Sequence, residues 1–226
     1  MNVLVVSAHP DDEVLGCGGT IARLAREGER VYLAVLGEGI TSRYEDRKEA
    51  DPSLVDGIRH RCKEAAKTLG AEDLFLFGLA DNRFDTIPLL DIVKKIEKLI
   101  GNLSPTIIYT HHEGDLNIDH SITYRAVLTA TRPIQGNGVR DIYTFEVPSS
   151  TDWAFHQSGQ SFQPNVFMDI TETLETKIQA LSVYETEMRA FPHPRSAKAI
   201  QANARRWGSG VGCEAAEAFE LIRSIR

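Results

Sequence analysis

The sequence has few cysteines and no long hydrophobic run. Its 226 residues include three cysteines, Cys17, Cys62 and Cys213, which lie far apart and form no CxxC pair. This spacing argues against a cysteine-based metal site and indicates free thiols in a reducing compartment. No stretch approaches the roughly 18 apolar residues that a membrane helix needs, so we expect no membrane insertion. The N-terminal run MNVLVVSAHPDDE is too short, and lacks the basic start, for a secretory signal, so we expect a cytoplasmic protein.

The chain also lacks an excess of positive charge. Its formal net charge at pH 7 is -7. Because an acidic surface repels phosphates, we expect no nucleic acid and no anionic lipid as partners. Hydrophobic residues make up 42% of the chain and charged residues 25%, which is typical of a globular protein that buries its own core.

Short β-branched segments alternate with segments of helical spacing along the first two thirds of the chain. The predicted elements, in chain order, are strand 3–7, helix 15–26, strand 31–36, helix 61–69, strand 74–77, helix 89–100, strand 106–110, helix 119–131 and strand 142–147. Strands that alternate with helices form a mainly parallel sheet with helices on both faces. We therefore predict the α/β class.

The pattern changes after Pro148. Residues 149–163 are rich in Ser, Gln and Gly, which predicts a loop over a site or at a subunit contact. Helical spacing returns at 171–184 and 197–206. We predict a single domain over 1–226, with a core at 1–147 and a mixed C-terminal elaboration at 148–226.

Polar side chains gather where the predicted strands end. Residues 9–13 follow the first strand, 38–49 the second, 81–82 the third and 111–120 the fourth. Ligands of open α/β sheets bind at the carboxyl ends of the strands, so we expect the site at this edge. The second segment belongs to a long charged loop, 38–57, of the kind that often forms a lid or a mobile segment.

Two motifs carry metal-binding chemistry. The first is Ala8-His9-Pro10-Asp11-Asp12-Glu13, and the second is Asp115-Leu116-Asn117-Ile118-Asp119-His120. His9, Asp12 and His120 would supply two imidazoles and a carboxylate, the set of a catalytic zinc with an open fourth position. Asp11 is then the spare carboxylate that can act as general base, and Asp119 can orient a histidine.

Other interpretations of these residues remain open. The acidic run at 11–12 could simply begin a helix, and Asp119 or Asn117 could cap the next one. The run Gly16-Cys17-Gly18-Gly19 is not a dinucleotide loop, because the position of the third glycine is Ile21, and we expect these glycines to allow close packing of helix and sheet. The remaining histidines are predicted to pack loops (His111 and His112) or to lie on the surface (His60 and His156).

The motifs AHPDDE and DxNxDH together resemble the LmbE-like, or PIG-L, family of deacetylases. Similar segments continue at 61–64, at Asp81, at 145–150 (FEVPSS), at 192–196 (PHPRS) and at 216–219, so the resemblance covers nearly the whole chain. It implies a Rossmann-like fold, a zinc ion and hydrolysis of the acetyl group of an N-acetylglucosamine-type sugar or conjugate. A small amino sugar would then be the partner, and a homo-oligomer is an open alternative to a monomer.

Site residues follow from the resemblance by motif position. It implies metal binding by His9, Asp12 and His120, general-base catalysis by Asp11, an acid beside the distal ligand at Asp119, and contacts to sugar hydroxyls or phosphate from Arg61 and Asp81.

One position departs from the family pattern. Several members carry a histidine three positions before the distal ligand, where this chain has Asn117. A neutral amide can donate a hydrogen bond to substrate but cannot deliver a proton near pH 7. We hypothesise that His193 supplies the missing imidazole, in its own subunit or a neighbouring one, although Pro192-His193-Pro194 could equally be a rigid turn. Glu146 is a weaker candidate.

Alternative functions are carried alongside the deacetylase. The same ligand set binds Fe²⁺, either in a hydrolase or in a non-haem iron oxygenase, which oxygen dependence would reveal. A non-catalytic sugar-binding protein would need a closed site with a fourth ligand, and the sequence offers none that is convincing. Within the family, the scissile bond could be another amide, such as that of a thiol conjugate.

Overall fold

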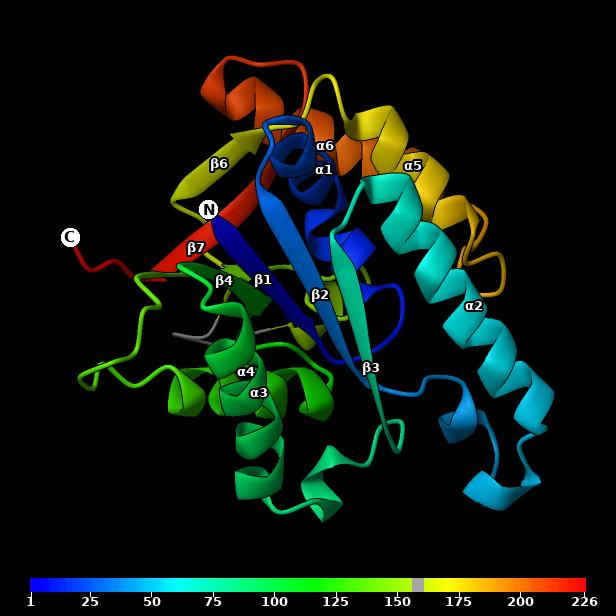
Figure 1. The fold of residues 1–226 in the computed structure, drawn as a ribbon. Helices are drawn as coiled ribbons and strands as arrows, with labels where there is room; N and C mark the ends of the chain where they lie inside the picture. Colours follow the sequence, from blue (N-terminus) through cyan, green and yellow to red (C-terminus); the bar gives the residue numbers. More distant parts are fainter. Residues whose placement is uncertain (156–160) are drawn as a thin grey trace.

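A computed structural model describes residues 1–155 and 161–226. At its centre, this part of the chain forms one sheet with the strand order β3-β2-β1-β4-β5-β7-β6 (Figure 1). The strands are β1 (Asn2–Ser7), β2 (Arg30–Gly37), β3 (Asp73–Leu79), β4 (Ile107–His111), β5 (Asp141–Phe145), β6 (Val166–Asp169) and β7 (Ala216–Arg223). β1 to β5 pair in parallel, whereas β7 runs antiparallel to both of its neighbours. The predicted α/β class, parallel Rossmann-like sheet and mixed C-terminal extension are confirmed.

Helices cover both faces of the sheet. They are α1 (Asp12–Arg26), α2 (Pro52–Leu69), α3 (Leu89–Leu103), α4 (Ile118–Ala130), α5 (Leu174–Ser182) and α6 (Ala197–Val211). α3 and α4 pack together on one face, and α1, α2 and α5 pack on the other (Figure 1). Alternate side chains of β1 point to opposite faces, so that Val3 and Val5 join one core and Leu4 and Val6 join the other.

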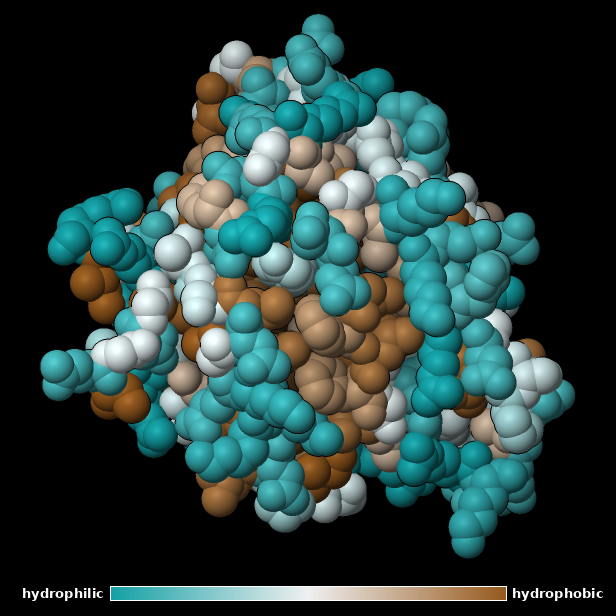
Figure 2. Space-filling model, viewed as in Figure 1, coloured by the Kyte–Doolittle hydropathy of each residue, from teal (hydrophilic) through white to brown (hydrophobic). Residues whose placement is uncertain are grey.

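The sheet is buried most deeply in the middle. Every residue of β2 after Arg30, and every residue of β1 after Asn2, is buried. At the sheet edge, the side chains of β3 after Asp73 are only partly buried, and hydrophobic side chains reach the surface beside α3 (Figure 2). In β4, every residue after Ile107 is buried as well. The two strands that precede the metal-binding motifs, β1 and β4, therefore lie between two helical layers.

The charged loop after β2 is shorter than predicted. α2 begins at Pro52 rather than Arg61, because the Asp51 side chain caps it by accepting a hydrogen bond from the Ser53 amide. An Asp cap followed by Pro at the first helical position is a favoured helix start. The predicted loop 38–57 therefore ends at residue 51, and it contains two 3₁₀ turns, Thr41–Arg43 and Arg47–Glu49.

Other boundaries also differ from the predictions. α3 continues past Gly101, α5 is shorter than the predicted 171–184, and α6 continues beyond Arg206 to a left-handed cap at Gly212. β6 and β7 were not predicted as strands. None of the described helices is long and apolar enough to cross a membrane. His156, predicted on the surface, lies outside the described residues.

Candidate metal centre

The first motif forms the turn between β1 and α1. Asp11 has a φ of 93°, in the left-handed region, and its side chain makes no capping hydrogen bond to the helix. For a non-glycine residue this backbone is strained, and such strain gathers at functional sites. The acidic run does begin a helix, because α1 starts at Asp12 with Asp11 at the N-cap position. The Asp11 carboxylate does not cap that helix, however; it is buried and lines a cavity of about 180 Å³.

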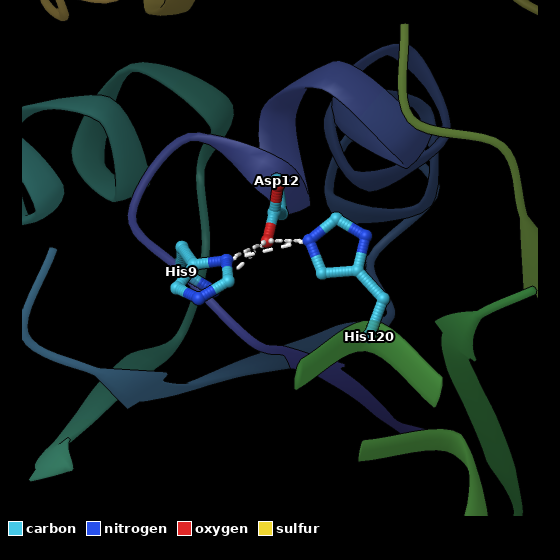
Figure 3. Close-up of side chains that lie close together, drawn as sticks. All are labelled: His9, Asp12 and His120. Carbon is cyan, nitrogen blue, oxygen red and sulfur yellow. Dashed lines mark hydrogen bonds and ion pairs between the residues drawn. The ribbon is translucent and has the colours of Figure 1, made fainter. Parts of the chain in front are cut away.

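His9, Asp12 and His120 meet beside this cavity (Figure 3). His9 Nδ1 lies 3.3 Å from His120 Nε2 and 3.3 Å from Asp12 Oδ2, and His120 Nε2 lies 3.2 Å from the same oxygen. A tetrahedral zinc ion with bonds of about 2.0–2.1 Å keeps its ligand atoms about 3.3 Å apart. The three atoms therefore have the spacing of three corners of such a site.

The Asp12 carboxylate is suited to a cation in a second way. It is buried, and its Oδ1 has no hydrogen-bond partner among the described residues. A buried polar atom without a partner is costly unless an ion or water satisfies it. The nearby imidazoles of His120 and His9 hold the pKa of Asp12 well below its usual range, although burial alone would raise it. The carboxylate is thus ionised and available to a metal.

In each histidine of this centre, the ring nitrogen that faces away from the ligand triangle lies close to a carboxylate. His9 Nε2 lies 3.0 Å from Asp119 Oδ2, and the Phe84 amide donates to the other Asp119 oxygen at 3.0 Å. His120 Nδ1 lies 3.2 Å from Asp115 Oδ1. Carboxylates in these positions fix the orientation of metal-binding imidazoles.

Asp115 is a functional residue that the sequence reasoning missed. Its carboxylate accepts hydrogen bonds from the Thr151 hydroxyl at 2.8 Å, from the Asn117 amide at 2.9 Å and from the Ser150 hydroxyl. Burial opposes ionisation, but the contact with His120 and these hydrogen bonds lower the pKa of Asp115 to about 2. Its position at the start of the DxNxDH motif was the available signal.

His111 also supports the centre. It is the last residue of β4, not a loop residue, and it is fully buried. Its ring stacks on that of His120 with centroids 3.9 Å apart, and its Nε2 accepts a hydrogen bond from the Ala8 amide at 2.8 Å. Burial holds its pKa well below the usual value, which suits this acceptor role. His112 turns elsewhere, with Nδ1 2.8 Å from Glu220.

Two of the predicted substrate-binding residues, Asp81 and Asn117, lie at the cavity. Asp81 lines it, with Oδ1 3.3 Å from His9 Nε2 and Oδ2 accepting a hydrogen bond from the Ser42 hydroxyl at 2.6 Å. Asn117 also lines it, donating to Asn82 at 2.8 Å. Its own oxygen accepts the Asp119 amide, so the predicted cap of α4 is confirmed at this residue.

Three other candidates lie away from the cavity lining. Arg61 is a partly buried residue of α2 and is not among the described residues that line the cavity. His193 is not among them either; its Nδ1 accepts the Arg195 amide at 3.1 Å, and its ring meets the edge of Trp153. Glu146 accepts hydrogen bonds from Asn203 and Trp207 beside a separate pocket. The roles assigned to these three residues stay predictions.

Arg195 lies in the PHPRS segment, and the sequence alone did not indicate a role for it. Its Nη1 donates to Asp11 Oδ2 at 2.9 Å, and the side chain lines the cavity. Burial raises the pKa of Asp11, and the negative charge of Asp12 raises it further. The positive charge of Arg195 lowers the pKa but does not cancel these effects, so the pKa of Asp11 stays well above its usual value. A carboxyl with a raised pKa in a cleft is typical of proton transfer.

The same sequence regions match known proteins. Residues 4–131 match the protein-family model described as PIG-L: GlcNAc-PI de-N-acetylase. The uncharacterized deacetylase YaiS of Escherichia coli (strain K12) is 32% identical over 193 residues, which cover 81% of this chain and 90% of that protein. The chain belongs to the PIG-L family. It is a metal-dependent N-deacetylase of that family, and the matched region includes His9, Asp12 and His120.

Other similar proteins are named for different reactions, a deacetylation and a hydration. The probable N-acetyl-alpha-D-glucosaminyl L-malate deacetylase 2 of Bacillus cereus is 27% identical over 200 residues, covering 87% of this PIG-L family chain and 88% of that protein. The structure of GalB, the 4-carboxy-2-hydroxymuconate hydratase from Pseudomonas putida KT2440, matches with a TM-score of 0.77 at 21% identity, covering 100% and 97% of the two chains. That likeness shows the fold alone, and a fold does not fix a reaction.

Proposed function

We propose that this PIG-L family chain is a zinc-dependent hydrolase that removes the acetyl group from an N-acetylglucosamine-type sugar or conjugate. The observation that carries the proposal is the triangle of His9 Nδ1, Asp12 Oδ2 and His120 Nε2, with sides of 3.2 to 3.3 Å. Two imidazoles and one carboxylate with an open position are a donor set of catalytic zinc, and the same set accepts Fe²⁺.

The neighbouring residues supply the proton chemistry. A zinc ion in this triangle would lower the pKa of a bound water and polarise the substrate carbonyl. Asp11 takes a proton as the water oxygen attacks the carbonyl carbon. The carbon–nitrogen bond then breaks, and the proton held by Asp11 passes to the leaving amine. The products are acetate and a free amino sugar.

The cavity lining supports a sugar substrate. Asp81, Asn82, Asn117 and Ser42 offer both donors and acceptors to hydroxyl groups. The family description and the name of the Bacillus cereus relative point to the same substrate class. His193 remains a second candidate for protonating the amine, and an unchanged kcat in His193→Ala would remove it. Arg61 remains a candidate for contacts outside the cavity.

An acetate-release screen tests the proposal. Zinc-loaded protein is given N-acetylamino sugars and their nucleotide, lipid, inositol and malate conjugates, and metal content is measured on the same sample. We expect acetate from at least one N-acetylglucosamine compound, loss of activity with a chelator and its recovery with zinc. The Asp12→Ala variant should lose both zinc and activity. Addition of water to an unsaturated dicarboxylate, with no acetate from any sugar, would contradict the proposal.

A further inference from the structure

Arg195 is held rigidly beside the cavity. It is followed by Ser196, whose hydroxyl caps α6 by accepting the Ala199 amide at 3.1 Å. On its other side, the Arg195 amide donates to His193 Nδ1 at 3.1 Å. The backbone is therefore fixed from both directions, and only 21% of the side chain is exposed.

The guanidinium joins two segments that lie far apart in the sequence. Its Nε donates to the Ser149 hydroxyl at 3.0 Å and lies 3.3 Å from the Pro148 carbonyl oxygen. Its Nη1 donates to Asp11 Oδ2 at 2.9 Å. Because guanidinium is a planar, rigid fork, the contacts at Nε fix the direction in which Nη1 points. Pro148 and Ser149, in the segment after β5, thus set the position at which Arg195 holds the Asp11 carboxylate.

Asp11 depends on this contact for its orientation. Its left-handed backbone and the missing capping bond leave the helix without a hold on the carboxylate. Among the described residues, Arg195 is the hydrogen-bond donor to this carboxylate. Nearby negative charges on Asp12 and Glu187 repel it. Without Arg195, nothing in this part of the chain would keep one carboxylate oxygen in place.

We propose that Arg195 is a positioning residue that holds Asp11 Oδ2 and thereby aims Oδ1 at the attacking water. The inference rests on the proposed role of Asp11 as general base. The match to the family model ends at residue 131 and does not include Arg195, and the resemblance of the PHPRS segment assigns no role to this residue. A carboxylate held at one oxygen keeps the other in the geometry that proton transfer requires.

The test compares Arg195→Gln and Arg195→Lys with Arg189→Gln as the matched control. Arg189 is an exposed residue of the same segment that donates to backbone carbonyls of its own loop. We expect Arg195→Gln to lower kcat for acetate release by about 10- to 100-fold with KM changed by less than about threefold. Zinc content should match that of wild type. Arg189→Gln should behave as wild type in every readout.

A double variant separates positioning from a general structural effect. If Arg195 acts through Asp11, then Asp11→Asn with Arg195→Gln should be no slower than Asp11→Asn alone. Losses that multiply would overturn the inference. So would an unchanged kcat in Arg195→Gln, or a raised KM at constant kcat, which would assign Arg195 to substrate binding.

Arg195→Lys provides a second test in case Arg195→Gln does not fold. Lysine keeps the charge but cannot contact Ser149 and Asp11 as one planar fork. We expect it to lose at least about tenfold in kcat, and full activity would overturn the inference. Failure of the proposed function has a different signature, because then wild type releases no acetate or Asp11→Asn keeps full activity.

Discussion

Residues that never touch the metal determine how well its ligands are placed. Asp119 contacts His9, and Asp115 contacts His120, each on the nitrogen that faces away from the centre. Asp115 is in turn fixed by three hydrogen bonds from its surroundings. The stacked ring of His111 completes the packing around His120. The ligand triangle is therefore preorganised by side chains from β4, the turn that follows it, α4 and the segment after β5.

At this scale we predict the effect of Asp115→Asn. The side-chain amide of asparagine has one oxygen that accepts hydrogen bonds, whereas the carboxylate of Asp115 has two. The substitution also removes the negative charge that faces His120. We expect zinc affinity to fall by about 10- to 100-fold, measured by competition with a chromogenic chelator. Asp85→Asn, on an exposed turn, is the control and should bind zinc as wild type does. An Asp115→Asn affinity within about twofold of wild type would contradict this role.

Among the elements, α1 has an unusual construction. The helix breaks at Cys17, with φ -145° and ψ 24°. A side chain at Gly16 would collide with the ring of Phe145, and one at Gly19 would come within 2.8 Å of Ile170. The expectation that these glycines permit close packing is confirmed. The first half of α1 thereby carries the metal-binding turn against β5.

A carboxylate near the C-terminus, that of Glu217, accepts hydrogen bonds from backbone amides at the start of the second half of α1. The amides of Gly19 and Thr20 donate to the Glu217 carboxylate of β7 at 2.9 and 2.7 Å. Lys177 of α5 lies 2.6 Å from the same carboxylate and donates to the Leu15 carbonyl at 2.8 Å. A buried carboxylate at free helical amides is stabilised by them and by the cation. This cluster locks α1, α5 and β7 together.

Breaking this cluster should destabilise the whole protein. Glu217→Ala leaves the Lys177 ammonium buried without its partner and the Gly19 and Thr20 amides unpaired. We expect the free energy of unfolding to fall by about 3–5 kcal/mol, measured by urea denaturation. Glu214→Ala, an exposed change three residues earlier, should stay within about 0.5 kcal/mol of wild type. A Glu217→Ala loss below about 1 kcal/mol would refute the argument.

For the molecule as a whole, the sequence predicts the parallel core better than the C-terminal third. The first five strands carry β-branched runs that stand out between helical segments. β6 and β7 show no comparable signal, because their identity as strands depends on pairing with one another and with β5. Glu217 likewise has partners almost 200 positions earlier in the chain.

The candidate site divides in the same way. His9, Asp12 and His120 could be proposed as ligands because each lies in a compact motif at a strand end. Arg195 could not be given a role, since its partner Asp11 lies 184 positions away. Asp115 shares a motif with His120, but two of the hydrogen bonds that fix it come from Ser150 and Thr151, in another segment. The start of α2 is a different case, because Asp51-Pro52 is a local signal that was present but outweighed by the charge of the loop.

The most direct test of the central claim is acetate release by zinc-loaded Asp11→Asn beside zinc-loaded wild type. The asparagine retains the shape of the side chain but cannot accept the proton. We predict that zinc content equals that of wild type and that kcat falls by about 10²- to 10⁴-fold. Full zinc content together with wild-type kcat would contradict the account, because hydrolysis would then proceed without the carboxylate beside the metal centre.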